Sequence, residues 1–212
     1  RSWALQAGIP TPPETYDLVS SITHYDHNVG ITSPAMFTVV RGKVPILGNA
    51  TGEDFKQYRI QVGQGLNPSS WIKIGDDKTR PVRKKELLVW DTQDFSGLYT
   101  LQLLVEREDR RVETSTIYVT VDNQAPEVAI LYPQAEQTID LNSITIQVAA
   151  KDDLRLDKVR IFMDDRLIAQ IDQAPYSTVW QTIPGKHTLT VEAIDQAGNL
   201  STASIQFSSK NP

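Results

Sequence analysis

The amino-acid sequence predicts an all-β protein made of two tandem β-sandwich domains, preceded by a proline-rich linker segment. Short runs of alternating apolar and polar residues recur from about Met36 onward and are bounded by Gly, Pro, Asn and Asp. One hairpin pattern occurs twice, 88 positions apart. The length of 212 residues suits two domains of about 100 residues each.

The first part of the chain, residues 1–35, differs in composition from the rest, and we interpret it as a linker or extended segment. Within it, Gly8–Asp17 holds three prolines, which favour extended or turn backbone and break helices. Because the chain opens on Arg1 rather than on methionine, we expect it to be a fragment whose secretion signal or anchor lies upstream. The first sandwich is then predicted over residues 36–121.

The clearest strand is Gly97–Val105, in which every second residue from Tyr99 onward is apolar. This is the period of a half-buried strand. A charged turn over residues 106–111 leads into a second alternating strand, Val112–Val121. The two segments are predicted to form a β-hairpin.

This hairpin recurs 88 residues later without a gap. The matched residues are Gly97 with Gly185, Thr100 with Thr188, Leu101 with Leu189, Leu103 with Val191, Val112 with Leu200, Thr114 with Thr202, Ile117 with Ile205, and Val119 with Phe207. A repeat of domain length is typical of tandem sandwich modules rather than of a solenoid. The polar segment 122–126 (DNQAP) is predicted to connect the domains, with the second sandwich over residues 127–212.

The second unit contains about seven short segments with strand character, separated by turn residues. The predicted strands are Glu127–Leu131, Ser143–Ala149, Lys158–Met163, Leu167–Ile171, Tyr176–Gln181, His187–Ala193 and Thr202–Phe207. Asp164–Arg166 is predicted to close a tight hairpin, and Gly198 and Asn199 suit positive φ. This number of strands with frequent turns predicts an immunoglobulin-like sandwich.

Two resemblances follow from longer stretches of sequence. The second unit, with VDNQAPEVAI, MDDRLI, PYSTVW and GKHTLTVEAIDQAGN, resembles the immunoglobulin-like modules of many bacterial surface proteins. The segments Trp3–Asp17, Ile31–Ala50, Tyr58–Trp71 and Leu87–Val105 resemble the C-terminal extension of class A penicillin-binding proteins of the Chloroflexi type. In that family a family 51 glycosyltransferase and a transpeptidase come first, so the resemblance implies a parent enzyme and not an activity of this chain.

The amino-acid composition limits the kinds of molecule that this chain is expected to bind. The net charge of −5 argues against a nucleic-acid-binding protein, which usually carries an excess of Lys and Arg. No apolar run approaches the roughly 18 residues that a membrane-spanning helix needs. The absence of cysteine rules out disulfides and thiolate metal sites.

One apparent catalytic motif is interpreted as a coincidence. Ser70-Trp-Ile-Lys73 matches the S-x-x-K of serine acyltransferases, and Lys78-Thr79 begins a K-T-G that Arg80 interrupts. The motif needs its Ser at the start of a helix, whereas residues 71–74 read as a strand, in which residues three apart point to opposite faces. An S-x-N pattern occurs only at 209–211. We expect no catalytic residue.

Two groups of residues could in principle ligate metals. His24, Asp26 and His27 could hold a transition metal, but only His187 remains as a further histidine, and a solvated loop is favoured. A second group consists of acidic residues that could contribute to a calcium site: Asp152, Asp153, Asp164, Asp165 and Asp195. They follow no EF-hand spacing, so turn and capping roles are favoured. We expect no metal site and no cofactor.

Some aromatic and basic residues could allow the chain to bind sugars or anionic polymers of the bacterial cell wall. Trp71, Trp90 and Trp180 could stack on sugars, but flanking strand residues favour core packing for each. A basic cluster could touch anionic wall polymers, although a solvated strand edge is favoured: Arg80, Arg83, Lys84 and Lys85.

Together these features predict a non-catalytic accessory region of a bifunctional peptidoglycan synthase, located outside the cytoplasm at the cell surface. It would act as a spacer or docking module, with peptidoglycan, cell-wall proteins or the parent's transpeptidase domain as partners, and with no nucleic acid. Two alternatives stay open: a carbohydrate-binding module, and a structural module of an adhesin or S-layer protein.

Overall fold

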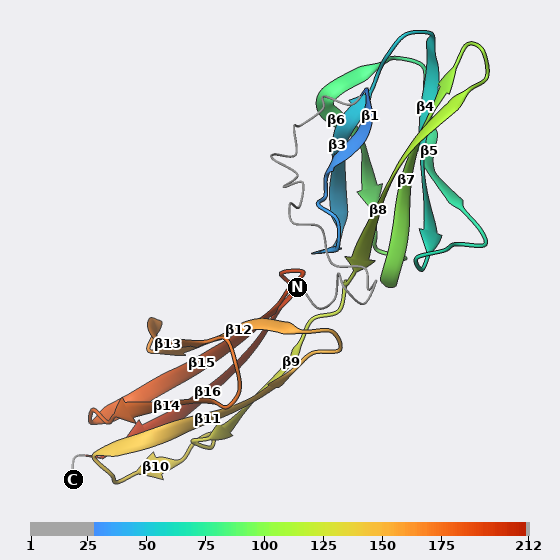
Figure 1. Ribbon diagram of the computed structural model, residues 1–212. Helices are drawn as coiled ribbons and strands as arrows, with labels where there is room; N and C mark the ends of the chain where they lie inside the picture. Colours follow the sequence, from blue (N-terminus) through green and yellow to red (C-terminus); the bar gives the residue numbers. More distant parts are fainter. Residues whose placement is uncertain (1–27, 211–212) are drawn as a thin grey trace, which may run out of the picture.

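The chain folds entirely into β-strands and loops over the part that can be described. A computed structural model describes residues 28–210, and it contains sixteen strands and no helix in that range (Figure 1). The all-β, immunoglobulin-like fold class predicted from the sequence is confirmed. None of the described residues form a helix that could cross a membrane.

The first sandwich is built from strands β1 to β8. A three-stranded sheet, in the order β1-β3-β6, faces a five-stranded sheet in the order β2-β8-β7-β4-β5. The strands are β1 Val29–Ser33, β2 Thr38–Val40, β3 Lys43–Ala50, β4 Phe55–Gln64, β5 Ile72–Lys78, β6 Val82–Asp91, β7 Gly97–Arg107 and β8 Val112–Val121.

The second sandwich repeats this plan with strands β9 to β16. Its smaller sheet has the order β14-β11-β9, and its larger sheet has the order β10-β16-β15-β12-β13. The strands are β9 Glu127–Tyr132, β10 Thr138–Ile139, β11 Ser143–Lys151, β12 Leu156–Met163, β13 Arg166–Ile171, β14 Tyr176–Gln181, β15 Gly185–Asp195 and β16 Leu200–Ser209.

The sequence repeat is a repeat of strand register. Gly97 pairs with Val121 across β7 and β8, and Gly185 pairs with Ser209 across β15 and β16, so both strands of the hairpin are offset by the same 88 positions. Leu101 is fully buried in the first sandwich, as its counterpart Leu189 is in the second, each at 0% exposure. Their predicted equivalence at buried positions is confirmed.

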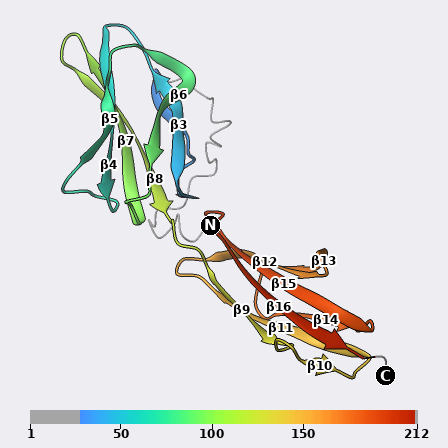
Figure 2. The same ribbon diagram turned by 180° about the vertical axis from the view of Figure 1, so that it is seen from behind.

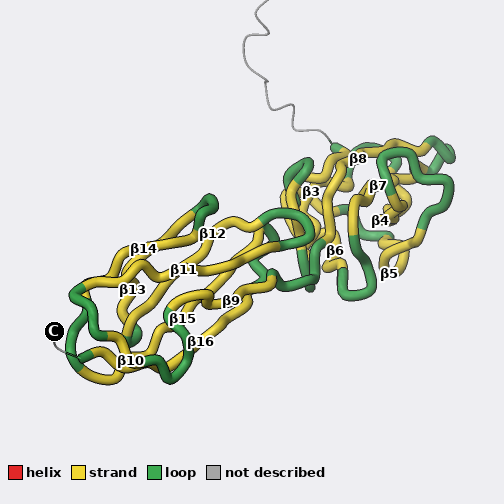
Figure 3. The backbone as a smooth tube through the Cα atoms, turned by 90° about the horizontal axis from the view of Figure 1, so that it is seen from below, coloured by secondary structure: helices red, strands yellow, loops and turns green. Residues whose placement is uncertain are grey.

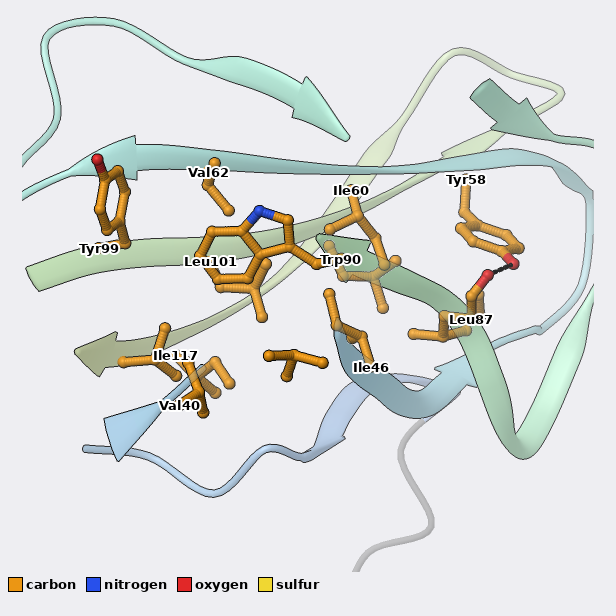
Figure 4. Packing of buried hydrophobic residues seen from close by; sticks show 14 of the residues in the cluster. Val40, Ile46, Tyr58, Ile60, Val62, Leu87, Trp90, Tyr99, Leu101 and Ile117 are labelled. Atoms are coloured by element: carbon orange, nitrogen blue, oxygen red, sulfur yellow. Dashed lines mark hydrogen bonds between the residues drawn. The ribbon is translucent and has the colours of Figure 1, made fainter. Parts of the chain in front are cut away.

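Each sandwich has its own apolar core, because alternate residues of both sheets point inward. In the first core, Trp90 packs edge-on against Phe95 and Tyr99, with ring centroids 5.2 and 6.0 Å apart. The Tyr58 hydroxyl lies in the same cluster and donates a hydrogen bond to the Leu87 carbonyl at 2.8 Å (Figure 4). The buried phenol oxygen therefore has a partner, as a buried polar group requires.

The second core contains an aromatic cluster at the end that lies away from the first sandwich. Trp180 packs edge-on against His187 and Phe207, with centroids 4.8 and 5.8 Å away. The His187 ring nitrogens are paired with the Asp164 carboxylate at 2.7 Å and the Ile183 carbonyl at 2.6 Å. His187 therefore serves the packing of the core.

The boundary of the first sandwich differs from the one expected. Residues 1–35 were interpreted as a linker, but β1 lies within that range and pairs antiparallel with β3. Val29 and Ile31 pack against the first core, which explains why the segment is a strand. The expectation was wrong for residues 29–33; residues 1–27 lie outside the described part of the chain.

The two sandwiches follow one another end to end, as the two opposite views show (Figures 1 and 2). Residues 122–126 lead from β8 to β9 without forming a strand. Seen along a perpendicular direction, the sheets of each sandwich form a separate body on either side of this junction (Figure 3). The turn between β15 and β16 lies at the junction and contacts the first sandwich.

Candidate functional site

The junction is closed by side chains from both sandwiches. Arg41, directly after β2, donates from Nε to the Ala197 carbonyl at 3.1 Å and from Nη1 to the Asn199 Oδ1 at 3.3 Å. Gly198, between these two residues, has a φ of 83° and lies against the Arg41 guanidinium. The turn predicted from Gly198 and Asn199 is therefore the part of the second sandwich that contacts the first.

Asn199 connects this turn to the linker. Its Nδ2 group donates to the backbone carbonyl of Asp122 at 3.0 Å and to the Asp195 Oδ2 at 2.7 Å. Its backbone N–H donates to the Asp195 Oδ1 at 2.8 Å. Asn199 is 6% exposed, so these bonds are sheltered from water.

Three carboxylates meet at this point from three separate segments. Asp122 follows β8, Asp152 follows β11, and Asp195 ends β15. One carboxylate oxygen from each lies within 4.8 Å of the other two. Asp122 and Asp195 are 3% and 1% exposed, and Asp152 is half-buried.

The hydrogen bonds to these carboxylates leave two oxygens without partners. Asp122 Oδ1 accepts from the backbone N–H of Gln124 at 3.0 Å, and Asp152 Oδ2 accepts from the N–H groups of Leu154 and Arg155 at 3.0 and 2.9 Å. Asp122 Oδ2 and Asp152 Oδ1 are buried and have no hydrogen-bond partner. Buried polar atoms are normally paired, so two such oxygens in one cluster call for an explanation.

The electrostatics of the cluster disfavour three negative charges. Burial raises the pKa of the Asp122 carboxyl, the Gln124 hydrogen bond lowers it by less, and the nearby carboxylates of Asp195, Asp153 and Asp152 raise it further. Chemically, the arrangement offers several oxygen ligands and a negative field. This combination suits a hard cation.

The sequence identified only part of this cluster. It named Asp152 and Asp195, which the fold brings together, and it missed Asp122. Asp164 and Asp165 lie elsewhere, in the β12–β13 turn with φ of 48° and 63°, where they serve the predicted tight hairpin. A recurring pattern, an apolar strand ending in Asp at Val121-Asp122 and Ile194-Asp195, was the available signal.

The S-x-x-K residues form no constellation in the structure. Ser70 lies in a bend before β5, Lys73 lies in β5, and both are exposed. The Lys73 ammonium is 3.6 Å from the Asp77 carboxylate. At the C-terminal end, the Ser209 hydroxyl donates to the Ile183 carbonyl, whereas Asn211 lies outside the described residues.

The tryptophans divide into two groups. Trp90 and Trp180 are buried, at 1% and 8% exposure, as predicted. Trp71 is 38% exposed, so the expected core position was wrong for this residue. It precedes the edge strand β5, where only one neighbouring strand can cover it.

The basic cluster lies where the sequence placed it, at an edge. Arg83, Lys84 and Lys85 are exposed on β6, the outer strand of the small sheet, and Arg80 is exposed in the preceding bend. Three of the other residues proposed as metal ligands, His24, Asp26 and His27, lie outside the described part of the chain.

A family model and several solved structures are similar to parts of the chain. Residues 126–191 match the family model described as "Bacterial Ig domain". No curated protein matches the chain. Among solved structures, the Clostridium thermocellum CbhA fibronectin(III)-like modules are 18% identical with a TM-score of 0.49, over 85% of this chain and 93% of that one.

Two animal structures are similar to a comparable extent. The chicken CNTN1 FN1–FN3 domains are 14% identical with a TM-score of 0.44, over 85% of this chain and 68% of that one. Murine CEACAM1b is 13% identical with a TM-score of 0.44, over 86% of this chain and 99% of that one. The fold of the described residues and the family match over residues 126–191 indicate immunoglobulin-like domains of the kind that serve as structural or binding modules.

Proposed function

We propose that the chain is a spacer and docking module that works outside the cytoplasm, as the accessory region of a bacterial peptidoglycan synthase. The match of the second sandwich to bacterial Ig domains supports a role in a bacterial surface protein. The parent enzyme is supported by the sequence segments quoted above, Trp3–Asp17 and Leu87–Val105 among them. The adhesin and S-layer alternative shares the spacer role and differs only in the parent.

The observation that carries the spacer role is the fixation of the linker on both sides. On the first sandwich, the Asp122 N–H donates to the Val40 carbonyl at 2.9 Å, and Asn123 accepts from the Gly42 N–H at 2.9 Å and donates to the Thr92 carbonyl at 2.7 Å. On the second, Asn199 donates to the Asp122 carbonyl. A linker bonded to both neighbours transmits orientation, which a free polar linker does not.

Small-angle X-ray scattering tests this role directly. The wild-type chain is expected to give a single elongated particle, and Arg41→Ala a broader distribution of interatomic distances, because the variant loses both junction bonds of the guanidinium. Arg166→Ala removes an exposed arginine in the second sandwich and should scatter like wild type. Wild-type scattering that requires freely varying domain angles would contradict a spacer of fixed orientation.

The carbohydrate-binding alternative gains one specific observation, the exposed indole of Trp71. Sedimentation with purified sacculi distinguishes electrostatic binding through the basic cluster from stacking of sugars on Trp71. Binding through exposed basic residues weakens as salt rises and when Arg83, Lys84 and Lys85 are neutralised, because exposed charges are screened within about 8 Å at physiological ionic strength. Binding that is independent of salt and lost in Trp71→Ala would make the chain a carbohydrate-binding module.

The parent protein is tested by its own sequence. An open reading frame that continues upstream of Arg1 through S-x-x-K, S-x-N and K-T-G, in that order, would establish the transpeptidase. An upstream region without these motifs would exclude the synthase as parent and leave the surface-module role in place.

A further inference from the structure

We propose that the carboxylate cluster at the domain junction is a calcium site, formed by Asp122, Asp152 and Asp195. The site lies where the linker, the β11–β12 loop and the end of β15 meet. The inference rests on these residues alone and does not depend on the identity of the parent protein.

The cluster holds buried carboxylate oxygens that lack a hydrogen-bond partner. Burying an ionised carboxylate is costly unless it is paired or coordinates a metal. Asp122 is 3% exposed, and its Oδ2 atom has no hydrogen-bond partner. Asp152 Oδ1 is also buried and has no partner. The guanidinium of Arg41 is close by, yet its hydrogen bonds go to Ala197 and Asn199 rather than to these oxygens. A bound cation would satisfy both atoms at once.

The first sandwich holds a cationic side chain, Arg107, at the position that matches Asp195. Arg107 ends β7 as Asp195 ends β15, 88 positions later, and both are buried. Arg107 pairs with Phe55 at the start of β4, and Asp195 pairs with Leu156 at the start of β12. The two residues therefore occupy equivalent positions in the two sheets.

The Arg107 guanidinium fills this end of the first sandwich. Its Nη1 atom donates to the Thr51 carbonyl at 2.8 Å and to the Glu53 carbonyl at 3.3 Å, in the loop between β3 and β4. Its Nε atom donates to Glu113 at 2.8 Å. The loop between β11 and β12 is the topological counterpart of the β3–β4 loop, and it supplies Asp152. The first repeat thus has a cationic side chain of its own beside carbonyl oxygens, whereas the second has a carboxylate, Asp195, at the matching position and Asp152 in the matching loop.

The ligand chemistry selects calcium among the common divalent cations. Calcium takes six to eight oxygen ligands at about 2.3–2.6 Å, so opposite ligands are up to roughly 5 Å apart. The three carboxylates lie within 4.8 Å of one another, close enough for one such ion to contact all three. Magnesium, at about 2.0–2.1 Å, needs a tighter octahedron, and zinc favours nitrogen or sulfur ligands, which the cluster lacks.

Calcium at this point would join three segments that are far apart in the sequence. Asp122 belongs to the linker, whose N–H is bonded to the first sandwich at Val40, whereas Asp152 and Asp195 belong to the second. The ion would therefore fix the second sandwich to the linker and reduce variation in the domain angle. Without it, repulsion between the carboxylates opposes the closed junction.

Isothermal titration calorimetry of the full 212-residue chain with CaCl₂ tests the site. We expect one ion per chain with a Kd of roughly 0.1–1 mM, the range of extracellular calcium modules. Asp152→Asn should weaken binding at least tenfold, since its amide keeps an acceptor for the Leu154 and Arg155 N–H groups but removes the unpartnered oxygen. Asp140→Asn is the matched control: it removes the same charge from an exposed position directly after β10, at the other end of the second sandwich, and should bind within about threefold of wild type.

Thermal unfolding provides the second measurement and checks that the variants fold. At tenfold excess over Kd, calcium should raise the melting temperature of wild type by about 5 °C or more relative to EGTA. Asp122→Asn and Asp152→Asn should lose this increase, while their melting temperatures in EGTA match or exceed that of wild type, because one of the repelling charges is gone.

Several outcomes would overturn the inference. The first is no heat of binding with wild type up to about 10 mM calcium, ten times the upper end of the expected range. The second is an equal loss of affinity in Asp152→Asn and Asp140→Asn. The others are magnesium binding as tightly as calcium, and a melting temperature of the cluster variants in EGTA below that of wild type. None of these outcomes would bear on the spacer role, which the scattering of the Arg41→Ala variant tests separately.

Discussion

Truncation of the two equivalent leucines tests whether the sandwiches are independent folding units. Leu101 and Leu189 are each 0% exposed, in separate apolar clusters. Replacing a buried leucine by alanine removes its transfer free energy and leaves a cavity, at a cost of about 2–5 kcal/mol. For a domain of 60–100 residues, 1 kcal/mol shifts the melting temperature by roughly 4–8 °C, so each truncation should lower one transition by about 8 °C or more.

Differential scanning calorimetry of Leu101→Ala and Leu189→Ala measures both transitions in the intact chain. Each variant is expected to move only the transition of its own sandwich. Leu167→Ala, at a position 48% exposed on β13, is the matched control and should stay within about 0.5 kcal/mol of wild type. The reasoning is refuted if either core truncation shifts both transitions equally, or if both cost less than about 1 kcal/mol.

Three further predictions concern single side chains. Arg107→Ala removes the donor to the Thr51 and Glu53 carbonyls and the ion pair with Glu113, so we expect the first sandwich to lose about 1–3 kcal/mol in urea unfolding, with the second unchanged. For Asp164, burial alone would raise the carboxyl pKa, but the hydrogen bonds from His187 and from the backbone outweigh it and the pKa is lowered from 3.8. The stabilisation from this carboxylate is present above pH 3.8 and is lost as the pH falls through the lowered pKa, so the difference in melting temperature between wild type and Asp164→Asn should shrink below pH 3.8. In-gel labelling with a fluorescent penicillin should give no covalent adduct, and a signal that disappears in Ser70→Ala would show acyl transfer instead.

Strands with a clear period of two were predictable from the sequence. Tyr176–Gln181 was predicted with the bounds that β14 has, and Glu127–Leu131 falls one residue short of β9. In both strands, exposed positions alternate with partly or fully buried ones, which is the period of a strand. Two of the strands that were not predicted show the limits of local pattern. The segment Val29–Ser33 contains a glycine and follows a proline-rich stretch, and Thr138–Ile139 is a two-residue strand defined only by its parallel pairing with distant β16.

The junction cluster shows where sequence reasoning reached its limit. Asp122, Asp152 and Asp195 are separated by 30 and 43 positions, and no spacing rule for a calcium loop covers such intervals. Only the pairing of β12 with β15, together with the path of the linker, brings them to one end of the sandwich. Trp71 shows a similar limit, because its flanking residues read as a buried strand while β5 lies at a sheet edge.

The repeat itself indicates why the cluster lies at the junction. The β7–β8 turn, with Arg107, is at the end of the first sandwich remote from the second, where a guanidinium can be satisfied by its own loop (Figure 1). The corresponding end of the second sandwich faces a neighbour, and there Asn199, which is bonded to Asp195, also donates a hydrogen bond to the linker at Asp122. A fixed arginine at this position would place a long side chain in the space that the linker needs. A carboxylate is shorter, and paired with carboxylates from two other segments it can hold a small removable cation instead, so that the junction would be strong in the presence of calcium and loosened in its absence.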